Sequence, residues 1–277
     1  MKVRVIHQFL GASLLLVSTT IGASAAEINM FGGSSSWDRT DIRNAGTAEI
    51  VDLTGQGGNL ENNAPAGTGA VRLTTTGDPD KAEVGTGGDF GTLGDFINGG
   101  SLSYNYYKDS FINGNPEASA AIKLTILDTT DTGPSGDGFT TFVYEPYWNT
   151  GTPGVSTPVP TDQWLNASID GATGTFWHTG LYNQGNMAGA PGVTLAEWLA
   201  IFGTTLLDAN IIGISVGLGT FNDDVVTYFD NIAFSNGAIN KTYDFEVAPI
   251  PVPAALPLLL SGLGLLGFFG LRRKARL

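Results

Sequence analysis

The chain has 277 residues and no cysteine, and its net charge is −13 at pH 7. Without cysteine it has no disulfides, no thiolate metal ligands and no thiol nucleophile. Residues 27–248 contain all 26 acidic residues and only seven basic ones, a net charge of seven minus 26, or −19, which opposes binding to nucleic acid and to anionic lipid.

The first 26 residues have the three parts of a secretory signal peptide. Lys2 and Arg4 give a basic start, residues 9–21 are mostly apolar, and small residues fill positions 23–26. This order predicts a signal peptide over residues 1–26 that is removed on export. The alternative, an N-terminal transmembrane helix, is disfavoured because the apolar core is short and ends in small residues.

Residues 27–248 are predicted to form one exported all-β domain. Short apolar runs alternate there with stretches of Gly, Asn, Asp, Thr and Pro, a pattern typical of a β-sandwich or barrel. The predicted strands cover residues 48–53, 70–75, 102–107, 120–127, 140–145, 163–169, 211–218, 225–234 and 241–246.

Several of these segments alternate with the period of a half-buried strand. In residues 120–127, Ile122, Leu124 and Ile126 share one face, and Lys123 lies on the other. In residues 225–234, Asp230 falls in phase with the apolar positions. It is therefore expected either to point into the core or to mark a break in the strand.

One amphipathic helix is predicted around residue 198. Thr194 fits an N-cap with Glu197 three residues later, and Gly203 fits a stop. Apolar residues recur at the spacing of one helix face: Leu195, Trp198, Leu199 and Phe202. We expect this short helix to cover one end of the sandwich.

The C-terminal half resembles a known architecture. Asp162-Gln163-Trp164, the helix at 194–202, Ile214–Gly219 and the run from Val226 to Ile232 follow one another in the order found in jelly-roll sandwiches. Such sandwiches are common among exported bacterial surface proteins and carbohydrate-binding modules. The resemblance implies a jelly-roll-like β-sandwich with one short helix over residues 27–248.

The sequence offers little for enzymatic catalysis. His178 is the one histidine of residues 27–248, and a structural role beside Trp177 is favoured over a Ser-His-Asp site. Acidic residues that could pair as in a glycosidase are too numerous to single out a pair. We therefore expect a protein that is not an enzyme, with a carbohydrate-active enzyme using two carboxylates as the alternative.

Aromatic side chains provide candidate sugar-binding residues, because aromatic rings stack on the apolar faces of sugar rings. Tyr147 and Trp148 flank a predicted loop around Pro146, and Trp177 lies beside His178. These three aromatic residues are the predicted ligand-binding set. Trp164 and Trp198 are instead assigned to the core.

Calcium is the predicted cofactor, as a structural ion. It prefers carboxylate and carbonyl oxygens, which acidic, glycine-rich loops supply. The candidate ligands form two separate clusters, one of Asp128, Asp131 and Asp137 and the other of Asp230 with Asp223 and Asp224. Asp230 resembles the aspartate near the last strand of calcium-binding jelly rolls. The alternative is that these carboxylates are simply solvated.

The C-terminal segment, residues 249–277, has three blocks in a fixed order. A proline-rich lead-in is followed by an apolar run at 254–271 and by a basic cluster of Arg272, Arg273, Lys274 and Arg276. As a helix the apolar run would reach about 25 Å, slightly less than a bilayer core of about 30 Å. The basic cluster predicts that the C-terminus stays on the cytoplasmic side, so the preceding domain lies outside.

This three-block order resembles the PEP-CTERM class of sorting signals. The motif residues are Pro251, Val252, Pro253, Ala254 and Ala255, closest to the VPxPA variant, and Pro251-Val252-Pro253 replaces the commoner Pro-Glu-Pro. The resemblance implies processing by an exosortase, a transpeptidase-like membrane protease. A plain tail anchor, held by one short helix, is the alternative.

Together these features predict an exported, non-enzymatic surface or matrix protein. It would be anchored in the membrane by its C-terminal helix, processed by an exosortase and then held at the cell surface or outside the cell, where its partner would be an extracellular polysaccharide. A purely structural matrix protein without a small ligand is a further alternative.

Overall fold

The computed structural model describes residues 25–33, 36–110, 114–130, 138–180 and 192–248. The predicted signal peptide and the predicted C-terminal helix, together with Asp131 and Asp137, lie outside these described residues. Within the described ranges, no helix is long and apolar enough to cross a membrane.

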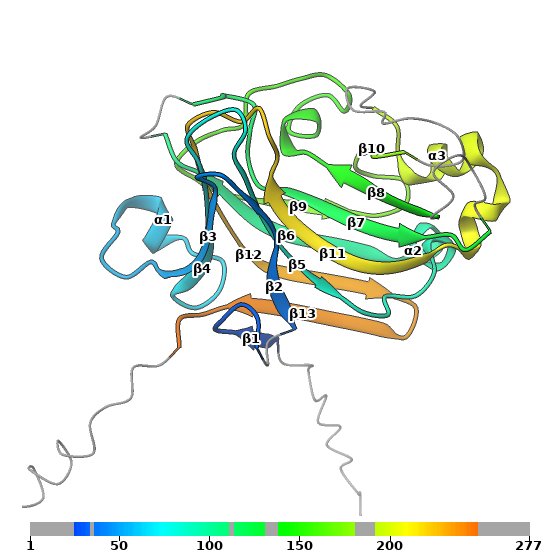
Figure 1. Cartoon of the computed structure of the whole chain (residues 1–277), viewed down its shortest axis with the longest axis horizontal. Coiled ribbons are helices and arrows are strands. Elements are labelled where there is room, and N and C mark those ends of the chain that lie inside the picture. The colour runs from blue at the N-terminus through cyan, green and yellow to red at the C-terminus, as the bar shows by residue number, and fades with distance from the viewer. Residues whose placement is uncertain (1–24, 34–35, 111–113, 131–137, 181–191, 249–277) are drawn as a thin grey trace, which may run out of the picture.

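Two mainly antiparallel sheets pack face to face (Figure 1). Sheet A contains β1 (Ala26–Ile28), β3 (Thr47–Asp52), β4 (Gly69–Thr75), β6 (Ser101–Lys108), β9 (Trp164–Ile169), β12 (Val225–Asn236) and β13 (Ile239–Phe245). The long strand β12 pairs with β6 along one edge, and with β4 and then β13 along the other. Strand β1 adds to β13 in the only parallel pairing among the described strands.

Sheet B has the strand order β10-β8-β7-β11-β5-β2. Its strands are β2 (Trp37–Arg43), β5 (Lys81–Gly87), β7 (Ala121–Leu127), β8 (Phe139–Tyr144), β10 (Trp177–His178) and β11 (Asn210–Leu218). All of its strand pairs are antiparallel.

The chain crosses between the sheets at matching positions. Strands β3-β4-β12-β6-β9 of sheet A stand in the same order as β2-β5-β11-β7-β8 of sheet B. Five crossing connections join two strands that hold the same position in the two sheets: β2 to β3, β4 to β5, β6 to β7, β8 to β9 and β11 to β12. This is the connectivity of a jelly roll, and it confirms the predicted fold class.

The core lies between the sheets and follows the predicted alternation. Ile122, Leu124 and Ile126 of β7 are fully buried, while Lys123 lies on the outer face of sheet B. The same alternation places Ala82 and Val84 of β5 inside. Burial of these alternating apolar faces is the main favourable contribution to folding.

The predicted helix is α3 (Leu195–Phe202), and its capping box is confirmed. Thr194 Oγ1 accepts a hydrogen bond from Glu197 N, and Glu197 Oε2 accepts one from Thr194 N at 2.7 Å. Trp198 is 1 % exposed and donates from Nε1 to Phe176 O at 2.9 Å, which fixes the helix to one end of the sandwich. The sequence pattern did not predict the short helices α1 (Gly58–Asn62) and α2 (Leu93–Gly99).

Asp230 both points into the core and marks a break. Its side chain is fully buried, and the register between β12 and β6 shifts between Asp230 and Ala233. Asn231, inside this irregularity, has a positive φ of 54°. The bulge lets β12 bend, so that β4 and β13 pair with different halves of it.

Candidate functional site

A groove runs over the outer face of sheet B. Two adjoining cavities, of about 430 Å³ and about 240 Å³, share the lining residues Ala121, Glu145, Trp177, Gly219 and Thr220. The shared lining makes the two cavities one continuous depression, which we call the groove. It lies on the opposite side of sheet B from the core.

Small residues form the floor of the groove. Gly217 of β11 has no room for a side chain, because a Cβ there would lie 2.8 Å from Ala82 O and 2.9 Å from Glu83 Cβ. Gly219, just after β11, is open: a Cβ there would meet only Asn222 Nδ2, at 3.8 Å. The absence of side chains on this stretch of β11 is what hollows the sheet face.

Aromatic side chains line one half of the groove. Tyr147 comes from the short 3₁₀ helix η1 (Pro146–Trp148), and Trp177 comes from β10. Trp177 pairs with Val143 of β8, and alternation therefore turns its ring outward while the next residue enters the core. Trp177 Nε1 donates a hydrogen bond to Glu145 Oε2 at 3.0 Å, which fixes the indole over the groove.

Phe221 is a third aromatic residue of the groove, and sequence reasoning missed it. Its side chain is 77 % exposed, and its backbone has a positive φ of 68°, which is unusual for a residue other than glycine. Its amide donates to Asp78 O at 2.7 Å, which holds the strained turn in place. A large exposed ring in a strained turn is a recognised indication of a functional position.

Glu145 occupies the junction of the two halves. Burial raises the pKa of its carboxyl, although hydrogen bonds from Trp177 and Tyr147 and the charge of Lys123 act in the opposite direction. The carboxyl of Glu145 is consequently more readily protonated than that of a solvated glutamate. It could donate or accept a hydrogen bond to a ligand in the groove.

A row of paired charges lines the other half, and we call it the charge ladder. It crosses the outer face from β2 through β5 to β7 and consists of Asp41, Arg43, Lys81, Glu83 and Lys123. Arg43 and Lys81 bind Asp41 at 2.6 and 2.7 Å, Lys81 also binds Glu83 at 3.1 Å, and Lys123 forms an ion pair with Glu83.

The ladder shifts the pKa values of its members. The hydrogen bond from Arg43, supported by Lys81, lowers the pKa of Asp41 to about 2. Burial raises the pKa of Glu83, but the ammonium groups of Lys123 and Lys81 outweigh this effect and lower it overall. Burial also lowers the pKa of Lys123, and Glu83 does not fully restore it.

The structure brings together two of the three predicted sugar-binding residues. Tyr147 and Trp177 both line the groove. Trp148 is not part of the lining of either cavity; its ring packs on Tyr147 with centroids 4.6 Å apart, and its Nε1 is buried without a hydrogen-bond partner among the described residues. Trp148 therefore packs against Tyr147 without lining the groove itself.

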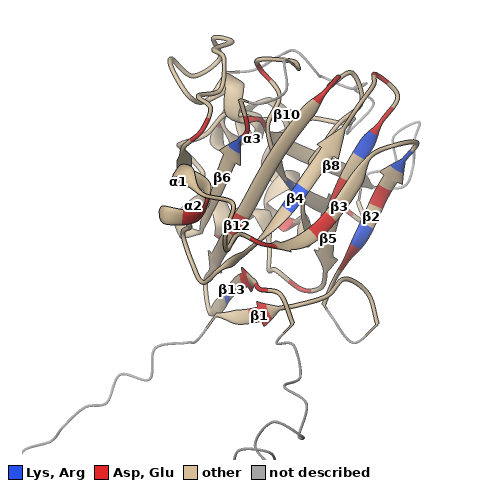
Figure 2. Cartoon of the chain, turned by 90° about the vertical axis from the view of Figure 1, so that its left-hand side faces the viewer, with Lys and Arg blue, Asp and Glu red and all other residues tan. Residues whose placement is uncertain are grey.

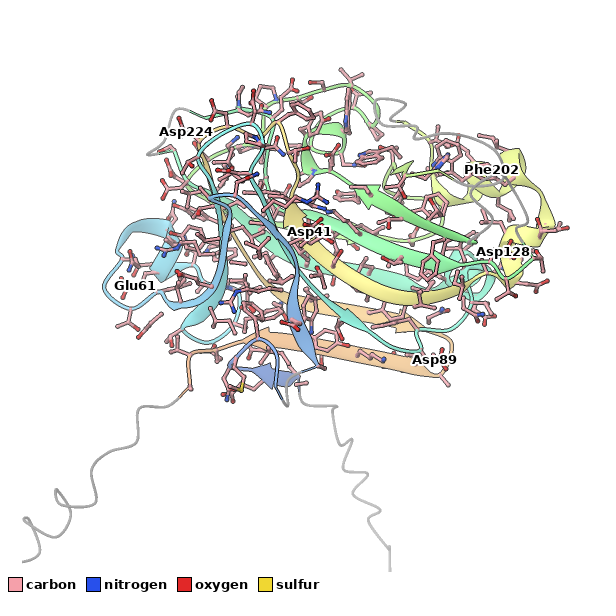
Figure 3. All side chains as sticks on the ribbon, in the orientation of Figure 1. Asp41, Glu61, Asp89, Asp128, Phe202 and Asp224 are labelled. Atoms are coloured by element: carbon pink, nitrogen blue, oxygen red, sulfur yellow. The ribbon has the colours of Figure 1, made fainter. Side chains whose placement is uncertain are left out.

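The two candidate calcium clusters lie in different parts of the structure. Asp128 ends β7 in sheet B and accepts hydrogen bonds from Thr130 N and Oγ1, whereas Asp230 lies in sheet A and accepts one from Phe245 N at 2.9 Å. Figure 3 places Asp128 and Asp224 at opposite ends of the molecule. Within the described residues, no three His, Cys, Asp or Glu side chains form a metal-binding group.

One feature of Asp230 nevertheless suits a cation. Its Oδ2 is buried and has no hydrogen-bond partner among the described residues, and the same holds for Asp244 Oδ1. An oxygen left in this way is satisfied by a proton, a water molecule or a cation.

His178 is a core residue. It is fully buried, its ring centroid lies 4.7 Å from that of Trp198, and its Nδ1 accepts a hydrogen bond from Gly180 N. Desolvation lowers its pKa, so the ring is neutral at physiological pH. It faces the opposite side of β10 from Trp177, and thus away from the groove.

Residues 249–274 match the PEP-CTERM protein-sorting motif. The chain therefore carries the sorting signal that its C-terminal sequence resembles, and this motif indicates an exported protein that is sorted to the cell surface. No curated protein matches this chain.

Several solved structures are similar to the chain at low identity. One is TmCBM61 in complex with β-1,4-galactotriose, with 13 % identity, 73 % of this chain and 89 % of the other covered, and a TM-score of 0.34. A putative sugar binding protein from Bacteroides thetaiotaomicron has 10 % identity, coverage of 77 % and 95 %, and a TM-score of 0.34. An exo-β-agarase has 13 % identity, coverage of 76 % and 24 %, and a TM-score of 0.37. With TM-scores below 0.5, these similarities carry no information on the ligand of the groove.

Proposed function

We propose that this exported protein binds an extracellular polysaccharide in the groove, without chemical turnover. The observation that carries the proposal is the convergence of Tyr147, Trp177 and Phe221 around Glu145 on an open, glycine-floored depression. We further propose that a signal peptide at 1–26 directs export. The helix at 254–271 would then anchor the chain until an exosortase-type membrane protease processes it.

The chemistry of the groove suits a sugar chain. Aromatic rings offer flat apolar surfaces for the C–H faces of pyranose rings. Around them, Asn115, Ser119 and Asn222 provide amide and hydroxyl groups for sugar hydroxyls. The groove is open along the sheet face, and an open groove admits an internal stretch of a polymer as well as its end.

The binding test compares two tryptophans. Trp177→Ala removes the ring that lines the groove, and we expect binding to a polysaccharide panel, measured by affinity electrophoresis, to be lost. Trp164→Ala is the matched control, because Trp164 is also a partly buried tryptophan that donates one Nε1 hydrogen bond, to Leu60 O at 3.0 Å, but it lies in sheet A. Equal binding by Trp177→Ala and by the unaltered protein would rule out the groove as the site.

A second candidate function, a glycoside hydrolase, is favoured by one observation. Glu83 and Glu145 line the same cavity, and their surroundings move their pKa values in opposite directions, as in enzymes that use one carboxylic acid and one carboxylate. Against this, both oxygens of Glu83 already accept hydrogen bonds from the protein. Release of reducing ends from the panel, abolished in Glu145→Gln, would establish the enzyme.

A further inference from the structure

Basic residues are concentrated in the groove. Of the seven in residues 27–248, Arg43, Lys81 and Lys123 line its second cavity. The acidic residues, in contrast, are spread over the whole fold, and the basic residues form a few separate segments (Figure 2). Residues 27–248 contain 26 acidic residues, so their composition alone would not predict a cluster of three basic residues. The cluster is therefore a specific property of the groove.

The carboxylates of the charge ladder are already occupied. Glu83 Oε1 accepts from Ser215 Oγ at 2.8 Å, and Glu83 Oε2 accepts from both lysines. Asp41 Oδ1 accepts from Arg43 Nε at 2.8 Å, while Asp41 Oδ2 accepts from Arg43 Nη2 and Lys81 Nζ. Every carboxylate oxygen of the ladder therefore has a partner.

The cations, in contrast, have donors in surplus. An ammonium group has three N–H donors and a guanidinium group has five. Within the described part of the chain, Lys123 Nζ has one acceptor, Lys81 Nζ has two, and Arg43 uses only Nε and Nη2. The unused hydrogen-bonding capacity of the ladder consists of positively charged N–H groups.

The unused N–H donors matter most for the free energy of binding where the cation is buried. The side chain of Lys123 is 11 % exposed, and desolvation lowers its pKa despite its pairing with Glu83. A cation that has few hydrogen-bond partners in a partly dehydrated groove is stabilised by an anionic ligand. The reason is that hydrogen bonds between charged groups are stronger than those between neutral groups.

We propose that the groove selects acidic polysaccharides, whose carboxylate or sulfate groups are bound by Arg43, Lys81 and Lys123 while the sugar rings lie on the aromatic half. This inference rests on the proposed polysaccharide binding. The negative charge of residues 27–248 would otherwise repel such polymers, so an acidic preference has to come from a local site.

The test uses polymer pairs that differ only in charge, with the protein purified from cells that export it. One pair is polygalacturonate and its methyl ester, and the other is dextran sulfate and dextran. We expect at least one acidic polymer to bind about tenfold more tightly than its neutral partner. The difference should shrink when NaCl is raised from about 50 mM to about 500 mM. The pair that responds identifies the anionic group as carboxylate or sulfate.

Two arginine variants locate the effect. Arg43→Gln, whose side chain is 56 % exposed and therefore replaceable without loss of the fold, should reduce the acidic preference severalfold. Arg72→Gln is the matched control, because Arg72 also pairs with a carboxylate, Glu49, but lies on β4 of sheet A. It should leave the preference unchanged.

The outcomes separate the two proposals. Equal binding of charged and neutral polymers that is lost in Trp177→Ala would overturn the acidic preference and leave polysaccharide binding in place. The same holds if Arg43→Gln and Arg72→Gln have equal effects on the preference. Binding to none of the four polymers and to no polysaccharide of the wider panel would overturn both.

Discussion

Asp230 is a buried carboxyl in the middle of sheet A. Its Oδ1 accepts a hydrogen bond from Phe245 N, but its Oδ2 has no partner among the described residues. Desolvation raises its pKa to about 7, more than the hydrogen bonds from Phe245 and Asn231 lower it, and the charges of Asp244 and Glu246 raise it further. The folded protein therefore holds this proton at a pH at which the unfolded chain has lost it.

The pH dependence of stability follows from this difference. Between pH 4 and about pH 7 the folded state binds more protons at Asp230 than the unfolded state, so this residue lowers stability as the pH rises through that window, by up to about 4 kcal/mol. Asp230→Asn keeps the acceptor for Phe245 N and removes the charge. We expect it to be more stable than the unaltered protein at pH 8 but not at pH 4, in urea unfolding with a chelator present. An effect of the same size at both pH values would contradict the assignment.

For single residues, prediction from the sequence succeeded where the alternation of a strand fixes the face to which a side chain points. The phase of β12 placed Asp230 toward the core, and the aromatic residues next to Pro146 drew attention to Tyr147. Phe221 could not be found in this way, because its role depends on a backbone with positive φ, and Phe is not a residue that usually signals such a conformation. The charge ladder joins side chains from three strands, and strand pairing cannot be read from one sequence.

At the level of elements, α3 depends on its N-terminal cap. Thr194→Ala removes the hydroxyl that accepts from Glu197 N, which should lower the free energy of unfolding by about 1 kcal/mol. Thr194→Ser retains the hydroxyl and is the control. Urea unfolding followed by tryptophan fluorescence reports the change, because Trp198 packs from this helix into the core. Equal stabilities of the alanine and serine variants would show that the capping box contributes nothing.

The end of β11 can be used to block the groove. Gly219→Leu places a side chain where a Cβ meets only one atom within 4 Å, so the stability should change by less than about 0.5 kcal/mol while polysaccharide binding is lost. Gly99→Leu at the end of α2 is the control, since a Cβ there meets nothing within 4 Å and Gly99 does not line the groove. If Gly219→Leu binds as well as Gly99→Leu does, the ligand does not occupy this part of the groove.

Nine predicted strands match observed ones to within two residues at each end. Most of them carry a clear apolar run, and in residues 241–246 the apolar residues Tyr243 and Phe245 alternate with polar ones. Four of the described strands were missed. Strands β1 and β10 have only three and two residues. In β2 and β5, Asp, Arg, Lys, Glu and Gly dilute the inward residues, as in Lys81–Gly87, where only Ala82, Val84 and Thr86 face the core. Strands β2 and β5 supply four of the five residues of the charge ladder. A strand that contributes polar residues to a site loses the very pattern by which strands are predicted.

For the molecule as a whole, the groove and the end of the strand that leads to the sorting signal belong to different sheets. Strand β13 ends at Phe245, and the sorting motif begins at residue 249, so the motif is attached to sheet A. Strand β1 pairs with β13, which brings the N-terminal end of the described chain to the same edge (Figure 1). The groove lies on the other sheet, sheet B.

Calcium remains a prediction for the whole domain. A cation bound only by the folded state stabilises it by about 2.7 kcal/mol when present at about a hundredfold excess over its dissociation constant. We expect a chelator to lower the melting temperature of the exported protein and calcium to restore it. Asp230→Asn should abolish this response if Asp230 Oδ2 is a ligand, and Asp128→Asn should abolish it if the ion is bound at the end of β7. A melting temperature unaffected by the chelator would show that the domain binds no structural calcium ion.

The sorting signal predicts how the chain behaves in the cell. Arg272, Arg273, Lys274 and Arg276 follow the apolar run, and positive charges at this position hold the end of a membrane helix on the cytoplasmic side. Replacing all four by Gln should let the helix slip or invert, and uncleaved protein should then accumulate or be released into the medium. Immunoblots of membrane, surface and medium fractions measure both the location and the loss of mass on cleavage. Replacing Arg72 and Lys241 by Gln removes basic residues of the β-sandwich alone and is the control. A processing pattern that is the same in both variants would mean that the basic cluster has no part in sorting, and that the proline motif and the apolar run suffice for recognition.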